Sequence, residues 1–225
     1  MRRLREEAGF TIVELLVAMT VGVAVLFALL GLLDTTTRLS ASTVDRVETT
    51  SRARLATDLL TTQVRSQLCL GTDLPALTSA TPTTMTFYGS LAPEASPLVV
   101  QRRTLTYDAA TKRILQTVWT GAGTRPNVTF DTAPVNSVIA EGIVPDGTTP
   151  VFQYFRFKVP AAGGAAVPAL ITTTPLVADD LARTIQIGFS FVAVGRRSTT
   201  RVDVDSKVYV RTSNPTNPDN SPLCL

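Results

Sequence analysis

The chain has 225 residues with 21 basic and 18 acidic side chains, a formal net charge of +3 and no histidine. The lack of histidine excludes Ser-His-Asp and Cys-His catalytic arrangements. The charge excess is small and dispersed, so nucleic-acid binding is disfavoured, although it is not excluded. We expect the basic doublets Arg102-Arg103 and Arg196-Arg197 to be solvated strand ends or turns.

Residues 1–9, MRRLREEAG, form a short basic leader in front of an apolar segment that runs from Phe10 to Leu33. As a helix these residues would extend about 36 Å, which is enough to cross about 30 Å of hydrocarbon. The arginines of the leader predict a cytoplasmic N-terminus, with the chain from Asp34 onward outside the membrane. The sequence therefore predicts a single-pass protein of the inner membrane.

Glu14 is the only charged residue of the apolar segment. A glutamate near the middle of a bilayer costs about 2.5–3.5 kcal/mol. We therefore expect a group outside the segment, on another chain, to satisfy this carboxylate.

Two simpler interpretations compete with this one. A secretory signal peptide also combines a basic and an apolar region, but its apolar region has about 7–15 residues. The small residues 40–42, which would provide a cleavage site, are separated from the apolar segment by Asp34 and Arg38. A plain membrane anchor fits the length of the segment but leaves Glu14 unexplained.

The helix is predicted to continue through residues 34–70 as an amphipathic segment, giving one helix of about 55 residues. Charged residues alternate there with apolar ones spaced mostly three to five residues apart. These apolar residues are Leu39, Val44, Val47, Ala53, Leu55, Leu59, Leu60, Val64 and Leu68.

Residues 71–212 are predicted to form a β-rich head domain, because prolines and glycines punctuate short alternating runs there. Residues 213–225 form a tail rich in proline and asparagine. We expect an α+β fold in which one sheet packs against the outer half of the long helix. The predicted strands are residues 84–88, 98–107, 113–119, 127–130, 151–159, 185–194 and 202–210.

The two cysteines, Cys69 and Cys224, form a candidate disulfide, since the head is expected to lie outside the membrane. Two unpaired thiols and an intermolecular bridge are the alternatives. Two distant cysteines without histidine do not predict a metal site. We expect no cofactor and no catalytic residues, and we interpret Asp179-Asp180 and Asp203 with Asp205 as solvated or turn carboxylates.

The run from Gly9 through Phe10 and Glu14 to Leu16, GFTIVELL, resembles the class III signal of type IV pilins and type II secretion pseudopilins. The resemblance implies that a prepilin peptidase cuts between Gly9 and Phe10 and that the new amine of Phe10 is methylated. It also implies that the apolar segment is kept as the filament core. Glu14 would pair with the N-terminal amine of a neighbouring subunit.

Within this group the chain is most similar to J-type minor pseudopilins and W-type minor pilins. Four short stretches carry this finer resemblance: residues 53–66, 84–89, 105–108 and 208–214. The implied function is that of a structural subunit of a pilus or pseudopilus on the cell envelope, and not that of an enzyme. The implied partners are the prepilin peptidase, other pilins or pseudopilins, the inner-membrane assembly platform and membrane lipid.

Two other functions remain open from the sequence. The first is a single-pass, membrane-anchored extracellular binding or adhesion module that is not assembled into a filament. The second is a secreted enzyme released by signal peptidase, which would have a new N-terminus near Thr43.

Overall fold

The computed structural model describes residues 11–71, 74–91, 98–159, 165–196 and 200–210. The chain divides into two compact units, Met1–Asp45 and Arg46–Leu225. Helix α1 (Ile12–Arg65) has 54 residues, which confirms the prediction of one long helix, and its residues from Arg46 onward belong to the second unit. The division after Asp45 differs from the predicted boundaries after residues 33 and 70, because contacts with the strands begin within the helix. The predicted leader and tail lie outside the described residues.

The described part of the first unit is helical from Ile12 onward. Every residue from Thr11 to Val44 is exposed. The threonine hydroxyls of this stretch donate to carbonyl oxygens of their own helix; Thr20, for example, donates to the carbonyl oxygen of Val17 at 2.9 Å. The first charged pair after Glu14 joins Arg38 Nε to Asp34 Oδ2 at 3.0 Å, directly after the apolar residues end.

The second unit contains two five-stranded antiparallel sheets and a two-stranded hairpin among the described residues. The first sheet has the order β1 (Leu77–Ala80), β2 (Thr84–Gly89), β3 (Gln101–Asp108), β4 (Arg113–Thr120) and β7 (Val135–Glu141). The second sheet has the order β10 (Val167–Leu170), β9 (Phe152–Lys158), β11 (Gln186–Val194) and β12 (Arg201–Tyr209), with β8 (Ile143–Val144) also paired to β11. The hairpin is β5 (Ala122–Thr124) with β6 (Asn127–Thr129), and α2 (Ala178–Ala182) is a short helix.

The prediction of one sheet is therefore wrong, and Gly142 shows where the chain changes sheets. This glycine lies between β7 of the first sheet and β8 of the second, with a φ of +67°. A side chain is strained at this φ, and a Cβ atom there would also lie 3.1 Å from the carbonyl oxygen of Val194. Such a break in an otherwise extended run is not visible in the alternation of apolar residues.

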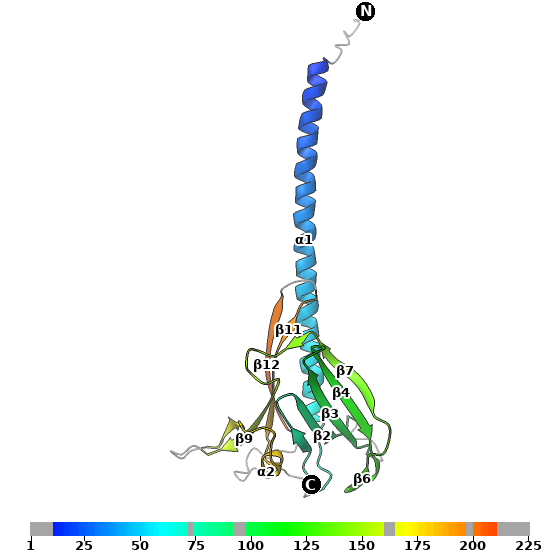
Figure 1. Cartoon of the computed structure of the whole chain (residues 1–225), viewed down its shortest axis with the longest axis vertical. Coiled ribbons are helices and arrows are strands. Elements are labelled where there is room, and N and C mark those ends of the chain that lie inside the picture. Colours follow the sequence, from blue (N-terminus) through cyan, green and yellow to red (C-terminus); the bar gives the residue numbers. More distant parts are fainter. Residues whose placement is uncertain (1–10, 72–73, 92–97, 160–164, 197–199, 211–225) are drawn as a thin grey trace, which may run out of the picture. The chain divides into compact units, whose positions relative to one another are not determined.

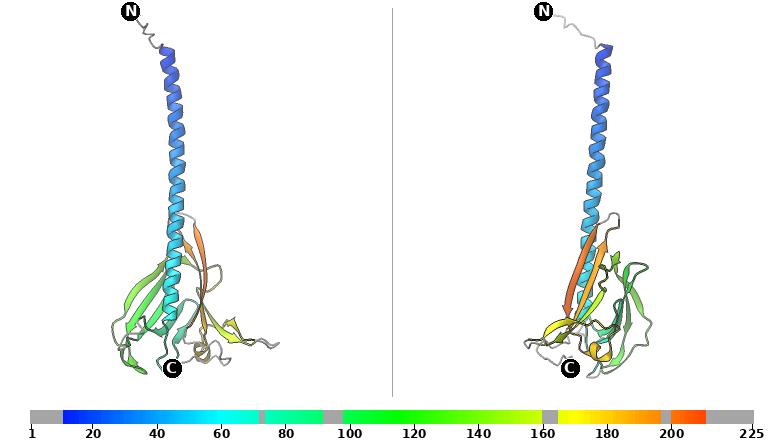
Figure 2. Two further views of the ribbon diagram at one scale, coloured as in Figure 1. Left: turned by 180° about the vertical axis from the view of Figure 1, so that it is seen from behind. Right: turned by 60° about the vertical axis from the view of Figure 1, so that its left-hand side comes forward.

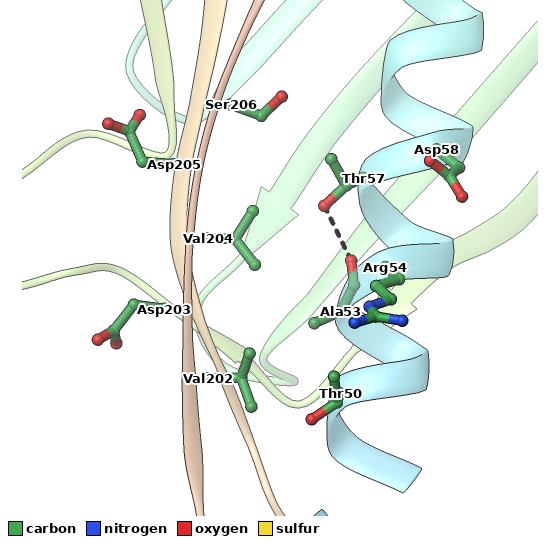
Figure 3. A pocket seen from close by; sticks show the side chains of 10 residues that line it. All are labelled: Thr50, Ala53, Arg54, Thr57, Asp58, Val202, Asp203, Val204, Asp205 and Ser206. Atoms are coloured by element: carbon green, nitrogen blue, oxygen red, sulfur yellow. Dashed lines mark hydrogen bonds between the residues drawn. The ribbon is translucent and has the colours of Figure 1, made fainter. Parts of the chain in front are cut away.

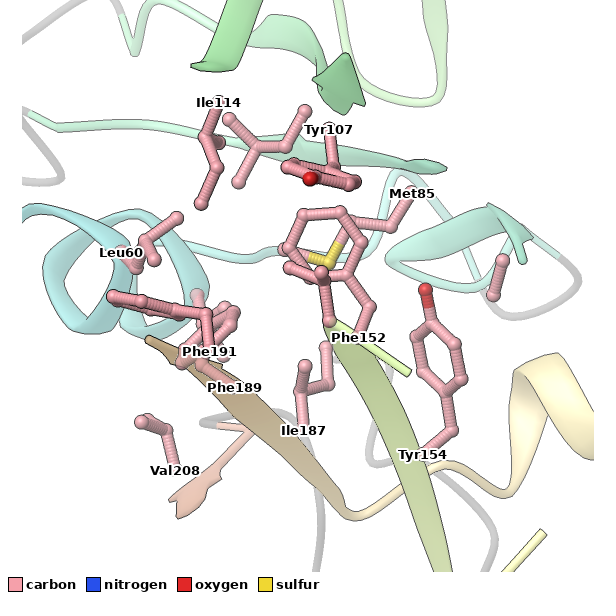
Figure 4. Close-up of a cluster of buried hydrophobic side chains, with 14 of the residues drawn as sticks. Leu60, Met85, Tyr107, Ile114, Phe152, Tyr154, Ile187, Phe189, Phe191 and Val208 are labelled. Atoms are coloured by element: carbon pink, nitrogen blue, oxygen red, sulfur yellow. The ribbon is translucent and has the colours of Figure 1, made fainter. Parts of the chain in front are cut away.

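The last turns of α1 and the inner faces of both sheets share one hydrophobic core (Figures 1 and 2). In Figure 4, Leu60 of α1 lies between Ile114 of the first sheet and Phe191 of the second. The fully buried residues of this core include Leu60, Val64, Met85, Phe87, Leu105, Ile114, Ile187, Phe189 and Phe191.

The face of α1 that packs on the sheets agrees only in part with the predicted one. Ala53, Leu60 and Val64 are buried as predicted and Ala56 joins them, whereas Leu55 is 59% exposed. Leu39, Val44 and Val47 are exposed as well. The two alanines follow a helical spacing, and their small side chains let the strands approach the helix closely.

The helix ends at Arg65 and not at the predicted residue 70, because the chain then pairs with the end of β2. Leu68 N–H donates to the carbonyl oxygen of Tyr88 at 3.0 Å, and Ser90 N–H donates to that of Ser66 at 2.9 Å. A Cβ atom on Gly89 would lie 2.7 Å from the Ser66 carbonyl oxygen, so this close approach requires glycine.

Candidate functional site

Glu14 lies in the first turn of α1, as the third residue of the helix. Thr11 precedes the helix, and its Oγ1 accepts a hydrogen bond from Glu14 N–H at 3.3 Å. A threonine in this position satisfies one of the free N–H groups at the start of a helix, and a carboxylate in the first turn is favoured by the helix dipole. The T-x-x-E spacing of residues 11–14 is the sequence pattern of such a start. The sequence analysis missed this signal and treated Glu14 as a mid-segment charge.

The apolar residues behind Glu14 form the one helix, among the described residues, that is long and apolar enough to cross a membrane. None of its most apolar stretch is buried within the structure. Large side chains from Ile12 to Leu33 are more than half exposed. A continuous apolar surface of this kind marks a membrane or protein contact.

Three residues of the predicted site lie at or beyond the limits of the described chain. Gly9 and Phe10, the predicted cleavage and methylation positions, lie outside the described residues. Cys69 is buried and disulfide-bonded. Cys224, the only other cysteine of the sequence, lies outside the described residues, so its pairing with Cys69 stays a prediction.

Arg103 corrects the interpretation of the first basic doublet as solvated. Its residue is 1% exposed, on the inner face of the first sheet. Arg103 Nε donates to Gln101 Oε1 at 3.1 Å, and its Nη1 donates to Gln63 Oε1. The same Gln63 oxygen accepts from Gln116 Nε2 at 3.0 Å. A buried polar network thus connects the last turn of α1 with β3 and β4.

The charge of Arg103 has no carboxylate partner among the described residues. Burial lowers the pKa of Arg103 to about 10, so the guanidinium remains protonated at neutral pH. The cation is therefore held by the neutral side-chain oxygens of Gln63 and Gln101.

The acidic pair Asp179-Asp180 is also only partly as predicted. Asp180 is 8% exposed and accepts from Arg156 Nη1 of β9 at 2.7 Å, while Asp179 is exposed and pairs with Arg183 at 2.7 Å. The Asp180 contact fastens α2 to the second sheet.

Arg196 of the second basic doublet is part of a network of surface ion pairs, while Arg197 lies outside the described residues. Glu141 pairs with Arg196 at 3.0 Å and with Arg113 at 3.1 Å. Glu48 of α1 lies 3.8 Å from the same Arg196. Partly exposed pairs of this kind each contribute little to stability.

Hydrogen bonding and burial also shift the pKa values of two further groups of the second unit, Tyr154 and Asp108. Burial raises the pKa of Tyr154, whose hydroxyl donates to the Thr81 carbonyl oxygen at 2.9 Å. Hydrogen bonds from Thr111 Oγ1 and from Ala110 N–H lower the pKa of Asp108, the last residue of β3.

A groove of about 570 Å³ lies between α1 and β12 (Figure 3). Val202 and Val204 point toward the helix, whereas Asp203 and Asp205 point away from it. The helix contributes small side chains together with Arg54 and Asp58, so only one carboxylate lies on the helix side and carboxylates do not converge in the groove. Among the described residues, no group of three or more histidine, cysteine, aspartate or glutamate side chains could hold a metal ion.

Comparison with protein-family models, with curated proteins and with solved structures finds no match to this chain. Function is consequently argued from the residues and their geometry.

Proposed function

We propose that this chain is a structural subunit of a type IV pilus or of a type II secretion pseudopilus. It is inserted in the inner membrane, cut by a prepilin peptidase between Gly9 and Phe10, methylated on Phe10 and assembled with other subunits. The inner-membrane platform, membrane lipid and other pilins or pseudopilins are its partners. The finer proposal is a minor subunit of the J or W type, and the function is structural and not catalytic.

The observation that carries this proposal is the order of three features. The GFTIVE sequence runs into the first turn of a helix whose apolar side chains are exposed, and the same helix continues into a β-rich unit. A filament subunit uses each of them. The signal directs processing, the apolar helix holds the subunit in the membrane before assembly and packs in the filament core afterwards, and the β-rich unit forms the filament surface.

Mass spectrometry of the mature N-terminus tests the proposal directly. We expect a chain that begins with N-methylated Phe10, in the membrane of the source organism and in sheared or purified filaments. A chain that retains Met1, or one that begins near Thr43, would contradict the proposal. A matched Gly9→Leu variant, which alters the residue before the predicted cut, is expected to accumulate uncut in the membrane.

A membrane tether is the second candidate function, and the position of Glu14 favours it. The Thr11 hydrogen bond and the first-turn position explain a glutamate there without any partner chain. The two functions therefore differ in what Glu14 does: in a subunit its charge pairs with an amine, and in a tether it only starts a helix.

Variants of Thr11 and Glu14 separate these two roles. Glu14→Gln removes the charge and keeps the shape, so filament recruitment is expected to fall more than about tenfold, since a buried pair is worth more than about 1.4 kcal/mol. Thr11→Ala removes the oxygen that accepts from Glu14 N–H and keeps the charge, so recruitment should stay close to that of the wild type. Immunoblots of the filament and membrane fractions measure the recruitment of each variant.

The membrane fraction serves as the control for both variants, because insertion depends on the apolar residues that neither variant alters. Equal recruitment of Glu14→Gln and wild type would favour the tether. Equal losses of recruitment for the two variants would show that Thr11 and Glu14 act by starting the helix and not by charge pairing.

A further inference from the structure

The outer face of the first sheet carries an arginine held between aromatic rings. Tyr88 of β2, Arg102 of β3 and Trp119 of β4 lie directly opposite one another in the strand register. The Arg102 guanidinium carbon is 4.4 Å from the centre of the Trp119 ring and 5.4 Å from that of Phe130. Phe130 also stacks on Tyr88, with ring centres 5.4 Å apart. We name these four residues the arginine–aromatic cluster.

The Arg102 side chain makes no hydrogen bond and no ion pair with the described residues, although its guanidinium carries five N–H donors. The rings fix the plane of the guanidinium and so lower the entropy cost of binding. Behind it, on the inner face of the same strand, Arg103 adds a second positive charge without a carboxylate partner. The cluster is therefore prepared for an anionic group, of which a carboxylate is the commonest in proteins.

The same chain presents a matching pair of carboxylates on β12. Asp203 and Asp205 are exposed, and they form no ion pair with the described residues. As neighbours on one face of a strand they lie about 7 Å apart. Arg201 and Lys207 flank them on that face, so the acidic feature is narrow and suits a single guanidinium better than a broad basic surface.

One copy cannot close this contact on itself. Arg103 and Leu105 alternate with Arg102 and face the core, so Arg102 points away from the core on the first sheet. Val202 and Val204 pack against the same core from the second sheet, so Asp203 and Asp205 point away from it on that sheet. The two features thus face outward from different sheets of the second unit.

We propose that the arginine–aromatic cluster of one copy binds the Asp203 and Asp205 carboxylates of a second copy. The contact joins two different surfaces, so it leaves one free surface of each kind and can repeat from copy to copy. A nucleic-acid phosphate has related chemistry, but the dispersed charge of the chain and the presence of the acceptor on the chain itself favour a second copy. The inference goes beyond the proposed function and does not depend on it.

Charge reversal with two tagged copies of the full chain tests this contact. The two copies are mixed in detergent micelles, one is captured by its tag, and the co-purified amount of the other is measured. Making both copies Arg102→Glu, or both Asp203→Arg with Asp205→Arg, is expected to lower co-purification about tenfold. Mixing an Arg102→Glu copy with an Asp203→Arg, Asp205→Arg copy should restore at least half of it.

Arg54→Glu is the matched control, since Arg54 of α1 is exposed, makes no side-chain hydrogen bond or ion pair with the described residues and lies outside the cluster. It should leave co-purification unchanged, and added salt should weaken the wild-type contact. Circular dichroism of each variant shows that it is folded. The swapped pair also guards against misfolding, because two misfolded copies would not restore binding.

Three results would overturn the proposal. The first is co-purification that no reversal changes, which would place any association in the apolar helix. The second is the absence of co-purification for the wild-type chain. The third is binding of a labelled DNA duplex that Arg102→Glu abolishes while copy-to-copy binding stays intact, which would assign the cluster to nucleic acid.

Discussion

At the scale of single residues, alternation along β3 explains why two neighbouring arginines have opposite environments. Arg103 shares the inward face with Leu105 and Tyr107, whereas Arg102 shares the outward face with the threonines of the strand. The sequence alone contained this signal, because the predicted strand already included both arginines. Glu14 is a similar case, since the T-x-x-E spacing was readable but its meaning depended on where the helix begins.

The Gln63 network gives a prediction in which the neutral residue matters more than the charged one. Gln63→Leu leaves the buried Arg103 guanidinium without its acceptor on α1 and should destabilise the chain by about 3 kcal/mol. Arg103→Met removes the charge along with its desolvation cost, and Gln63 keeps its bond from Gln116, so a loss of about 1 kcal/mol or less is expected. Urea unfolding of the full chain in detergent measures both.

The double variant completes the comparison, because an apolar pair leaves no guanidinium to satisfy. Gln63→Leu with Arg103→Met should be more stable than Gln63→Leu alone. A larger loss for Arg103→Met than for Gln63→Leu would show that the cation itself stabilises the second unit.

At the scale of elements, the long helix and most of the longer strands were predictable, whereas two edge strands, β7 and β10, were not. β2, β4, β9, β11 and β12 agree with the predicted ranges to within two residues at each end. β7 was missed because its first four residues are exposed and do not alternate, and β10 because it contains a proline. These strands exist because neighbouring strands offer backbone partners, and that long-range information does not appear in their own residues.

Two leucines of α1 test which of its faces packs on the sheets. Leu60 is fully buried and Leu55 is 59% exposed, although hydrophobicity alone treats them alike. Leu60→Ala should lower the free energy of unfolding by about 2–5 kcal/mol, because it leaves a cavity between the sheets. Leu55→Ala should change it by less than about 0.5 kcal/mol, and thermal unfolding of the full chain distinguishes the two. Similar losses for both would mean that the exposed face of α1 is covered by another part of the protein.

At the scale of the whole molecule, composition predicted the coarse organisation well. The change from an apolar helix to a chain punctuated by proline and glycine corresponds to a helical first unit and a β-rich second unit. The number of sheets did not follow from composition, because it is decided at Gly142, where one residue redirects the chain. The cluster around Arg102 was equally hidden, since its four residues come from three strands and a segment beyond β6 that only the fold brings together.

The packed face of α1 also determines how the second unit responds to mechanical load. Ala53, Ala56, Leu60 and Val64 contact both sheets through one core, and Gln63 adds hydrogen bonds near the end of the helix. A pull along the axis of these turns would strain the contacts to both sheets at the same time, and contacts loaded in parallel yield at a higher force than contacts that open in succession. The second unit can therefore carry tension applied through its helix before its strands separate.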